Sequence, residues 1–304
     1  MELIISLGAL LVIAVLARKE LETLRKHVFE VLYNHRDKLN EHSQLIEELQ
    51  NRPVYVPPPV VEIVAEQPKS VPVTVPVMLP SIGHTLIVGK SGSGKSNVAM
   101  LEIINRLKLK HLLYIVDTKQ EMGPIFAKHC VEVVGTEGAT DMMQKLLKVA
   151  KERRDKFTLA SAMFTKPCRD YKEYERLTGE KMPVITLVLE ELIVLMGRIE
   201  QNELIELLVV GRSAGVFVFA LAQYLKSDIL DRKGSVNFMT RVFLGRWDRI
   251  GISILFGSIR KIKAEEYMEY LGQPGRALIE TEGKDLELFT FPRIEDAELE
   301  EWMK

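Results

Sequence analysis

The sequence predicts an α/β fold with a mostly parallel central sheet, and two observations support this prediction. From residue 83 onward, short apolar runs rich in β-branched residues alternate with helical patterns, which is the order expected of a parallel sheet with helices on both faces. The first run also leads directly into a glycine-rich octapeptide that opens a helical pattern. We expect, in chain order, a strand at 84–88, a helix at 95–107, a strand at 112–116, a helix at 141–157, and strands at 184–189 and 216–222.

The octapeptide Gly89-Lys90-Ser91-Gly92-Ser93-Gly94-Lys95-Ser96 matches the phosphate-binding pattern G-x-x-x-x-G-K-[ST]. The glycines let backbone N–H groups surround the phosphates, Lys95 can reach the β and γ oxygens, and the Ser96 hydroxyl can hold Mg²⁺. The alternative is a glycine-rich turn that binds nothing, which the strand before and the helix after disfavour. The sequence therefore predicts ATP and Mg²⁺ as cofactors and a RecA-like P-loop NTPase architecture.

A pair of acidic residues follows the strand at 184–189 and predicts the second half of the nucleotide site. In a parallel sheet, Glu190 and Glu191 would lie at the carboxyl edge beside the phosphate-binding loop. We expect Glu190 to complete the Mg²⁺ shell through water and Glu191 to orient or deprotonate the attacking water. The alternative is an ordinary strand end with two solvated acids.

Two further candidates flank the strand at 216–222. Gln223 ends this strand and is expected to face the γ-phosphate. Arg212 precedes the strand and could neutralise transition-state charge at the site of a neighbouring subunit. An arginine that acts in this way requires an oligomer.

Composition limits the class of protein without naming the partner. The chain has 304 residues, 47% hydrophobic and 27% charged content, and a net charge of −1. This charge supplies no global attraction to nucleic acid, so any such binding must come from local basic loops. Cys130 and Cys168 are too few for a disulfide framework or a cysteine-based metal site and suit a reducing compartment.

The N-terminal region predicts a membrane anchor at 1–19. Residues 3–17 are uninterrupted apolar or small residues, closed by Arg18 and Lys19. The stretch is short against the roughly 20 residues that span a bilayer. The positive residues on its C-terminal side predict a single-pass protein with the N-terminus outside and the rest in the cytoplasm. A cleaved signal peptide and a buried or interfacial helix are the alternatives.

Two segments separate this anchor from the predicted α/β domain. Residues 20–51 are charged, lack Gly and Pro, and have heptad-like apolar spacing, which predicts a solvated stalk helix or a coiled coil. Residues 52–80 hold eight of the thirteen prolines and predict a semi-rigid linker. The ATPase motor domain is expected at 81–304.

These residues together resemble the FtsK/HerA superfamily of ring-forming, DNA-pumping ATPases, and more closely its FtsK-like branch. The resemblance extends over about residues 85–291 and depends on the order and spacing of several segments. Asp117-Thr118-Lys119 is similar to the branch's Asp-Pro-Lys, and residues 151–157 are similar to its Glu-x-x-Arg-Arg-Tyr helix. Residues 168–174 are similar to its Arg-Asn-x-x-x-Tyr segment, and residues 211–223 to its strand ending in Thr-Gln. Residues 237–241 are similar to its Asn-x-x-x-Arg segment, and residues 275–277 to its closing strand. The chain departs from the family at Glu190, where Asp is usual, at Ala222, where Thr is usual, and at 224–226, where Arg-Pro-Ser is usual.

The resemblance implies a hexameric ring that encircles double-stranded DNA and contacts it through basic loops. The candidate contacts are Lys166, Arg169, Lys226, Arg232 and Lys233, which could touch phosphates without reading bases. Ordinary solvated surface charge is the alternative for each loop. Arg241 is either a second phosphate sensor or a structural ion-pair partner.

The leading hypothesis for function is a membrane-anchored, ATP-driven DNA translocase, serving plasmid or conjugative transfer or viral DNA packaging and delivery. A second hypothesis is a P-loop ATPase that powers protein secretion or assembly, because ATP chemistry does not name the cargo. A third is an ATP-gated scaffold with weak hydrolysis, which the Glu190 substitution permits.

Overall fold

The computed structural model describes residues 79–226, 229–230, 232–245, 249–257, 267–282, 284–295 and 298–303. The predicted anchor at 1–19, the stalk at 20–51 and all but the end of the linker at 52–80 lie outside these residues. Within the described part of the chain, every helix is too short or too polar to cross a bilayer. The membrane anchor therefore stays a prediction.

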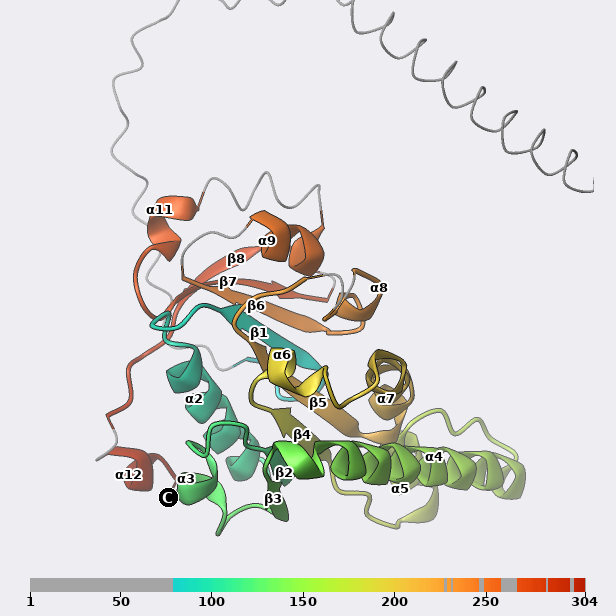
Figure 1. Cartoon of the computed structure of the whole chain (residues 1–304). Coiled ribbons are helices and arrows are strands. Elements are labelled where there is room, and N and C mark those ends of the chain that lie inside the picture. The colour runs from blue at the N-terminus through green and yellow to red at the C-terminus, as the bar shows by residue number, and fades with distance from the viewer. Residues whose placement is uncertain are drawn as a thin grey trace, which may run out of the picture. The chain divides into compact units, whose positions relative to one another are not determined.

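An eight-stranded sheet forms the centre of the domain, with strand order β3-β2-β4-β5-β1-β6-β7-β8 (Figure 1). The six strands from β3 to β6 in this order are parallel, and β7 and β8 join antiparallel. The predicted mostly parallel sheet is therefore confirmed. The strands are β1 (Thr85–Gly89), β2 (Leu112–Val116), β3 (Glu132–Val134), β4 (Ile185–Leu189), β5 (Val216–Ala222), β6 (Thr240–Leu244), β7 (Arg276–Thr281) and β8 (Glu287–Thr290).

The helices agree with the sequence-based elements where a prediction was made. The helix expected at 95–107 is α2 (Lys95–Lys108), and the one expected at 141–157 is longer at both ends, forming α4 (Ala139–Phe164). The other described helices are α3 (Gly123–Phe126), a 3₁₀ turn η1 (Thr136–Gly138), α5 (Tyr171–Thr178), α6 (Leu192–Leu195), α7 (Gln201–Ala214), α8 (Arg232–Ser235), α9 (Arg249–Phe256), α11 (Met268–Leu271) and α12 (Leu299–Met303).

Helices cover both faces of the sheet, and alternate strand residues point into two separate cores. On β1, Leu86 and Val88 pack with α4, α6 and α7, whereas Ile87 packs with α2, α3 and α12 (Figure 1). Every residue of β1, β4, β5 and β6 is buried. Strands buried on both faces have no polar side to show, which explains the continuous apolar runs of the sequence.

A buried ion pair fixes the point where the chain enters the domain. Leu79, the first described residue, is buried, and its N–H donates to Glu102 Oε1 at 2.8 Å. The Arg106 guanidinium lies 2.7 Å from Glu102 Oε2, 3.3 Å from Thr85 Oγ1 and 4.5 Å from the centre of the Phe219 ring. The last residues of the predicted linker are thus packed against α2, the helix that follows the phosphate-binding loop.

Candidate nucleotide-binding site

The phosphate-binding loop lies between the carboxyl end of β1 and the amino end of α2, at the position that the sequence predicts. Its turn is closed by the Ser93 N–H, which donates to Lys90 O at 3.1 Å. Gly92 and Gly94 have φ values of 79° and 91°, a left-handed conformation that other residues rarely adopt. Two of the glycines in the pattern are therefore required by backbone conformation.

The loop is supported from the far end of the sequence by the turn before β7. The Gly275 N–H donates to Ser93 O at 2.9 Å. A Cβ atom on Gly94 would lie only 2.9 Å from Gly275 N. This close approach gives Gly94 a second reason to be glycine.

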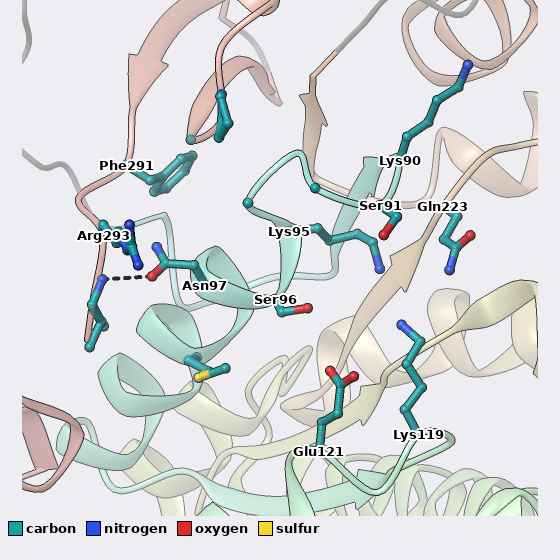
Figure 2. A pocket seen from close by; sticks show the side chains of 16 residues that line it. Lys90, Ser91, Lys95, Ser96, Asn97, Lys119, Glu121, Gln223, Phe291 and Arg293 are labelled. Atoms are coloured by element: carbon teal, nitrogen blue, oxygen red, sulfur yellow. Dashed lines mark hydrogen bonds between the residues drawn. The ribbon is translucent and has the colours of Figure 1, made fainter. Parts of the chain in front are cut away.

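A cavity of about 720 Å³ opens beside the loop. Figure 2 shows its two ends: the side-chain ends of Lys95, Lys119 and Gln223 point toward one another at one end, and Asn97, Phe291 and Arg293 lie at the other. Its lining residues are Lys90, Ser91, Gly92, Gly94, Lys95, Ser96, Asn97, Met100, Lys119, Glu121, Gln223, Pro274, Gly275, Phe291, Arg293 and Ile294.

Glu191 follows β4 and contacts residues that follow β1, β2 and β5 at this edge of the sheet. Its Oε1 atom accepts a hydrogen bond from the Gln223 N–H at 3.0 Å. Its Oε2 atom lies 3.5 Å from Lys95 Nζ and 3.5 Å from Lys119 Nζ. Burial lowers the pKa of Lys95, and the Glu191 carboxylate opposes that effect. The structure thus brings together Lys95, Glu191 and Gln223, as the sequence predicts.

Glu190 faces the loop after β2 instead of the phosphate-binding loop. Its Oε2 atom accepts hydrogen bonds from Lys119 N–H at 2.8 Å and from Thr118 Oγ1 at 3.1 Å. Burial raises the pKa of Glu190, and a hydrogen bond with the neighbouring Asp117 carboxyl raises it further. The expected carboxylate pair at the sheet edge is therefore buried, with a different surrounding for each member.

The donor set fits a magnesium ion that is held mainly by phosphate oxygens. Ser96 lines the cavity, whereas Glu190 lies outside the lining, with its Oε2 atom bonded to the loop of Lys119 and its carboxyl group beside that of Asp117. No cluster of three His, Cys, Asp or Glu side chains suited to a metal occurs in the described ranges. Mg²⁺ is usually bound through one or two protein ligands together with substrate phosphates and water, so Ser96 is placed to be a direct ligand, and Glu190 would act only through water.

The other end of the cavity is formed by a C-terminal segment that Asn97 fastens to the first turn of α2. Asn97 Nδ2 donates to Pro292 O at 2.6 Å, and Asn97 Oδ1 accepts from the Ile294 N–H at 2.7 Å. This segment places Phe291, Arg293 and Ile294 on the cavity wall. The sequence-based site missed these residues because they lie almost 200 positions from Asn97, and no motif connects them.

Arg212 lies away from the phosphate-binding loop of its own chain. It is in the last turn of α7, before the amino end of β5, whereas Gln223 follows the carboxyl end of that strand. Its guanidinium forms a two-point contact with Glu282, with distances of 3.2 and 2.8 Å. The seven residues of β5 separate Arg212 from the nucleotide site, a span of about 23 Å at the usual strand rise.

Arg241 has the surroundings of a structural residue. It lies on β6 opposite Glu280 of β7, and its guanidinium NH2 is 2.7 Å from Glu280 Oε2. Both residues are buried, and neither lines the nucleotide cavity. Of the two predictions made for Arg241, the geometry favours the ion-pair partner.

Among the candidate DNA contacts whose side chains are described, Lys166 and Arg169 lie at one edge of the sheet and Lys226 at the other. Lys166 and Arg169 follow the carboxyl end of α4, and Arg169 lines a small pocket with Arg212 at the amino edge of the sheet. Lys226 follows β5 at the opposite edge, with its ammonium group 5.3 Å from the centre of the Tyr224 ring. Arg232 and Lys233 belong to α8, but their side chains lie outside the described residues.

Comparison with solved structures shows which class of fold this is. The conjugation coupling protein TcpA of pCW3, solved with ATPγS, aligns with a TM-score of 0.60 and 19% identity over 73% of this chain. EssC (ATPases 2 and 3) from Geobacillus thermodenitrificans aligns with a TM-score of 0.56 and 19% identity over 73% of this chain. The Thermomonospora curvata type VII secretion ATPase EccC aligns with a TM-score of 0.53 and 18% identity over 70% of this chain.

These alignments show that the domain shares its fold with these three proteins. The chain spans 64% of the TcpA chain, 42% of the EssC chain and 26% of the EccC chain. No sequence model of a protein family matches the chain, and no curated protein matches it.

Proposed function

We propose that the chain is an ATPase whose hydrolysis cycle moves DNA through a ring of identical subunits. The observation that supports this most strongly is the convergence of Lys95, Gln223 and the acidic Glu191 beside a glycine loop and a cavity of about 720 Å³. A cavity of that volume is in the range that holds a small-molecule ligand. The sequence segments shared with the FtsK-like branch, and the fold likeness to a conjugation coupling protein, favour DNA as cargo.

The hydrolysis mechanism assigns one role to each converging residue. Backbone N–H groups of residues 89–96 surround the phosphates, and Lys95 turns to the β and γ oxygens. Ser96 would hold Mg²⁺ directly and Glu190 through water, and the bound ion would neutralise developing charge on the phosphates. Glu191 orients the attacking water and accepts its proton, and the Gln223 side chain at the end of β5 senses the γ-phosphate.

The base and ribose of the nucleotide are assigned to the other end of the cavity. Met100, Pro274, Phe291 and Ile294 supply an apolar wall there, which suits a nucleobase. Arg293 lines the same end and can approach the ribose. The Asn97 contacts with residues 292–294 fix this wall relative to the loop that holds the phosphates.

The assembly is proposed as a hexameric ring from the resemblance to the FtsK-like branch, and Arg212, which lies too far from its own nucleotide site to act there, would act on a neighbouring subunit. In a ring, the amino edge of one subunit's sheet would face the carboxyl edge of the next, and Arg212 would then supply charge at the neighbour's γ-phosphate. The anchor at 3–17 would hold this ring at a membrane with the motor domain in the cytoplasm.

Protein cargo is the second candidate function. Two of the solved structures with this fold are EssC and EccC, and the latter is a type VII secretion ATPase. The net charge of −1 gives DNA no general advantage over protein as cargo.

ATP hydrolysis by the full chain, with and without long double-stranded DNA, tests the proposal. We expect hydrolysis that DNA stimulates several-fold, and loss of hydrolysis in a Lys95→Ala variant. Hydrolysis that depends on Lys95 but ignores DNA would favour protein cargo. No hydrolysis under either condition, with nucleotide still bound, would favour the ATP-gated scaffold.

A further inference from the structure

The loop after β2 contains a lysine to which the mechanism above assigns no role. Asp117-Thr118-Lys119 is the segment that resembles the Asp-Pro-Lys of the FtsK-like branch. Lys119 lines the nucleotide cavity, and Figure 2 shows its side chain reaching toward Lys95 and Gln223. A solvated surface lysine would have no reason to point into this cavity.

The backbone of this loop is fixed on both sides of Lys119. Before it, the Asp117 N–H donates to Val134 O at 2.8 Å, which ties the loop to β3. After it, the Asp117 carboxylate accepts from Gly123 N–H at 2.6 Å and Glu121 N–H at 3.2 Å. The Lys119 N–H itself donates to Glu190 at 2.8 Å. The loop therefore fixes the position from which the Lys119 side chain leaves the backbone.

Lys119 and Lys95 both contact the same oxygen atom of Glu191. Glu191 Oε2 lies 3.5 Å from the ammonium of each residue. The Glu191 side chain is 3% exposed and that of Lys95 is 6% exposed, whereas that of Lys119 is 32% exposed. In the part of the chain that the structure describes, Lys95 and Lys119 are the cations that contact this carboxylate.

Nucleotide binding removes one of these two partners. The Lys95 ammonium has to turn to the β and γ phosphate oxygens, and its contact with Glu191 Oε2 is then lost. Without either cation, Glu191 would keep only the Gln223 N–H, on its other oxygen, among its described contacts. A buried carboxylate compensated so little is unfavourable and can rotate away from the reacting atoms. Lys119 is already in contact with the same oxygen and has no role in the phosphate-binding loop.

We propose that Lys119 is a positioning residue for ATP hydrolysis: it holds Glu191 Oε2 after Lys95 has moved to the phosphates, and so keeps the carboxylate aimed at the attacking water. This inference rests on the proposed ATPase function. In the step that Lys119 supports, the water oxygen bonds to the γ-phosphorus, and the bond from that phosphorus to the bridging oxygen breaks. ADP leaves with the electron pair, and the proton of the water passes to Glu191. Lys119 is unchanged at the end.

The test compares Lys119→Gln, Lys119→Arg and the control Lys128→Gln in the full chain. Lys128 lies in the same connection between β2 and β3, is exposed, and is remote from the cavity lining. Two quantities are measured: the kcat and KM for ATP with Mg²⁺, and the Kd of a fluorescent ATP analogue with and without Mg²⁺. Far-ultraviolet circular dichroism checks that each variant is folded.

We expect Lys119→Gln to lower kcat by about 10- to 100-fold, less than the roughly 10²- to 10⁴-fold that a general base itself contributes, while KM and Kd stay within about twofold. Lys119→Arg keeps the charge and recovers most of the lost rate. Lys128→Gln behaves as the wild type. A Kd that rises about tenfold in Lys119→Gln with little change in kcat would overturn the inference and make Lys119 a phosphate-binding cation.

A double variant separates positioning from an independent contribution. Because Lys119 acts through Glu191, single-turnover hydrolysis by Glu191→Gln/Lys119→Gln should be as slow as that of Glu191→Gln alone. If the rate of the double variant fell below that of Glu191→Gln by the same factor that Lys119→Gln causes in the wild type, the inference would be contradicted. If the wild-type chain hydrolyses ATP and Lys119→Gln equals it, this inference alone fails. If the wild type binds the analogue without hydrolysis, the proposed function fails and the inference falls with it.

Discussion

Arg212 and Glu282 form a two-point ion pair at the edge of the sheet opposite the nucleotide site, with nitrogen-to-oxygen distances of 3.2 and 2.8 Å. Both side chains are about half exposed. An exposed pair of this kind stabilises a fold by at most about 1 kcal/mol. In the proposed ring, the arginine could therefore leave Glu282 at little cost for the γ-phosphate bound to an adjacent subunit.

Arg212→Ala is expected to lower ATP hydrolysis by about 10³-fold, the usual effect of losing such an arginine, without changing nucleotide affinity. Co-expression with Lys95→Ala provides the decisive measurement. Each variant is inactive alone, but in a mixed ring an intact Lys95 meets an intact Arg212 at about a quarter of the interfaces. Recovered hydrolysis in the mixture supports action across the interface, and a mixture as inactive as its parts would contradict it.

Asn97 determines the shape of the base end of the cavity through its two contacts with residues 292–294. Asn97→Ala should lose about 2 kcal/mol of unfolding free energy, because each lost hydrogen bond contributes about 1 kcal/mol. It should also weaken nucleotide binding several-fold as the wall of Phe291 and Ile294 moves. Urea unfolding and titration with a fluorescent ATP analogue measure the two effects.

The control for Asn97 is Gln144→Ala, which removes an exposed hydrogen bond to Glu203 on α7. This variant should change the unfolding free energy by no more than about 0.5 kcal/mol. Nucleotide affinity that is unaffected by Asn97→Ala would show that the C-terminal segment does not take part in binding.

The sequence predicted the phosphate end of the site well because its determinants are local. The glycines, Lys95 and Ser96 follow one another in a loop whose strand and helix have strong apolar patterns, and Glu191 and Gln223 each end a continuous apolar strand. In a parallel sheet, strand ends meet at one edge, so pattern alone placed these residues together.

The base end and the supports of the loop could not be predicted in this way. Phe291 and Arg293 reach the cavity only because Asn97 binds the backbone of residues 292–294, and backbone contacts leave no pattern in the sequence. Likewise, nothing in the motif indicated that Glu190 would turn to the loop of Lys119 while Glu191 meets Lys95. Two adjacent carboxylates have opposite directions on a strand end, and only coordinates show which is which.

The buried pair of Glu102 and Arg106 should be a strong determinant of stability. Both side chains are at most 1% exposed, and burial raises the pKa of Glu102 and lowers that of Arg106. Arg106→Met leaves Glu102 without its cation, and we expect a loss of about 3 to 5 kcal/mol in unfolding free energy. Urea denaturation followed by circular dichroism measures this loss.

The matched control is the exposed pair of Lys148 and Glu152, which has the same helical spacing at a distance of 4.0 Å. Lys148→Met should change the unfolding free energy by no more than about 0.5 kcal/mol. Equal small losses in Arg106→Met and Lys148→Met would mean that the buried pair contributes no more than a surface contact.

His84 should make the stability of the domain depend on pH. The imidazole is fully buried between Phe217 and Phe238, and its Nδ1 atom accepts a hydrogen bond from the Val218 N–H at 2.9 Å. Burial lowers the pKa of His84 from 6.5 to about 3, a net value in which a hydrogen bond with the Leu208 backbone opposes burial and the nearby Arg212 charge adds to it. Because the folded pKa lies below the unfolded pKa, the contribution is complete above pH 6.5 and is lost progressively as the pH falls toward 3.

When the pH falls from 7.5 to 5, His84 should lower the unfolding free energy by about 2 kcal/mol, because its imidazole takes up a proton in the unfolded chain and not in the folded chain. His84→Asn keeps an acceptor for the Val218 N–H and has no proton to bind, so its stability should fall less over the same interval. The exposed His129→Asn serves as the control and should keep the wild-type dependence. Urea unfolding at both pH values gives the comparison, and an equal fall in wild type and His84→Asn would assign the acid sensitivity to carboxylates instead of His84.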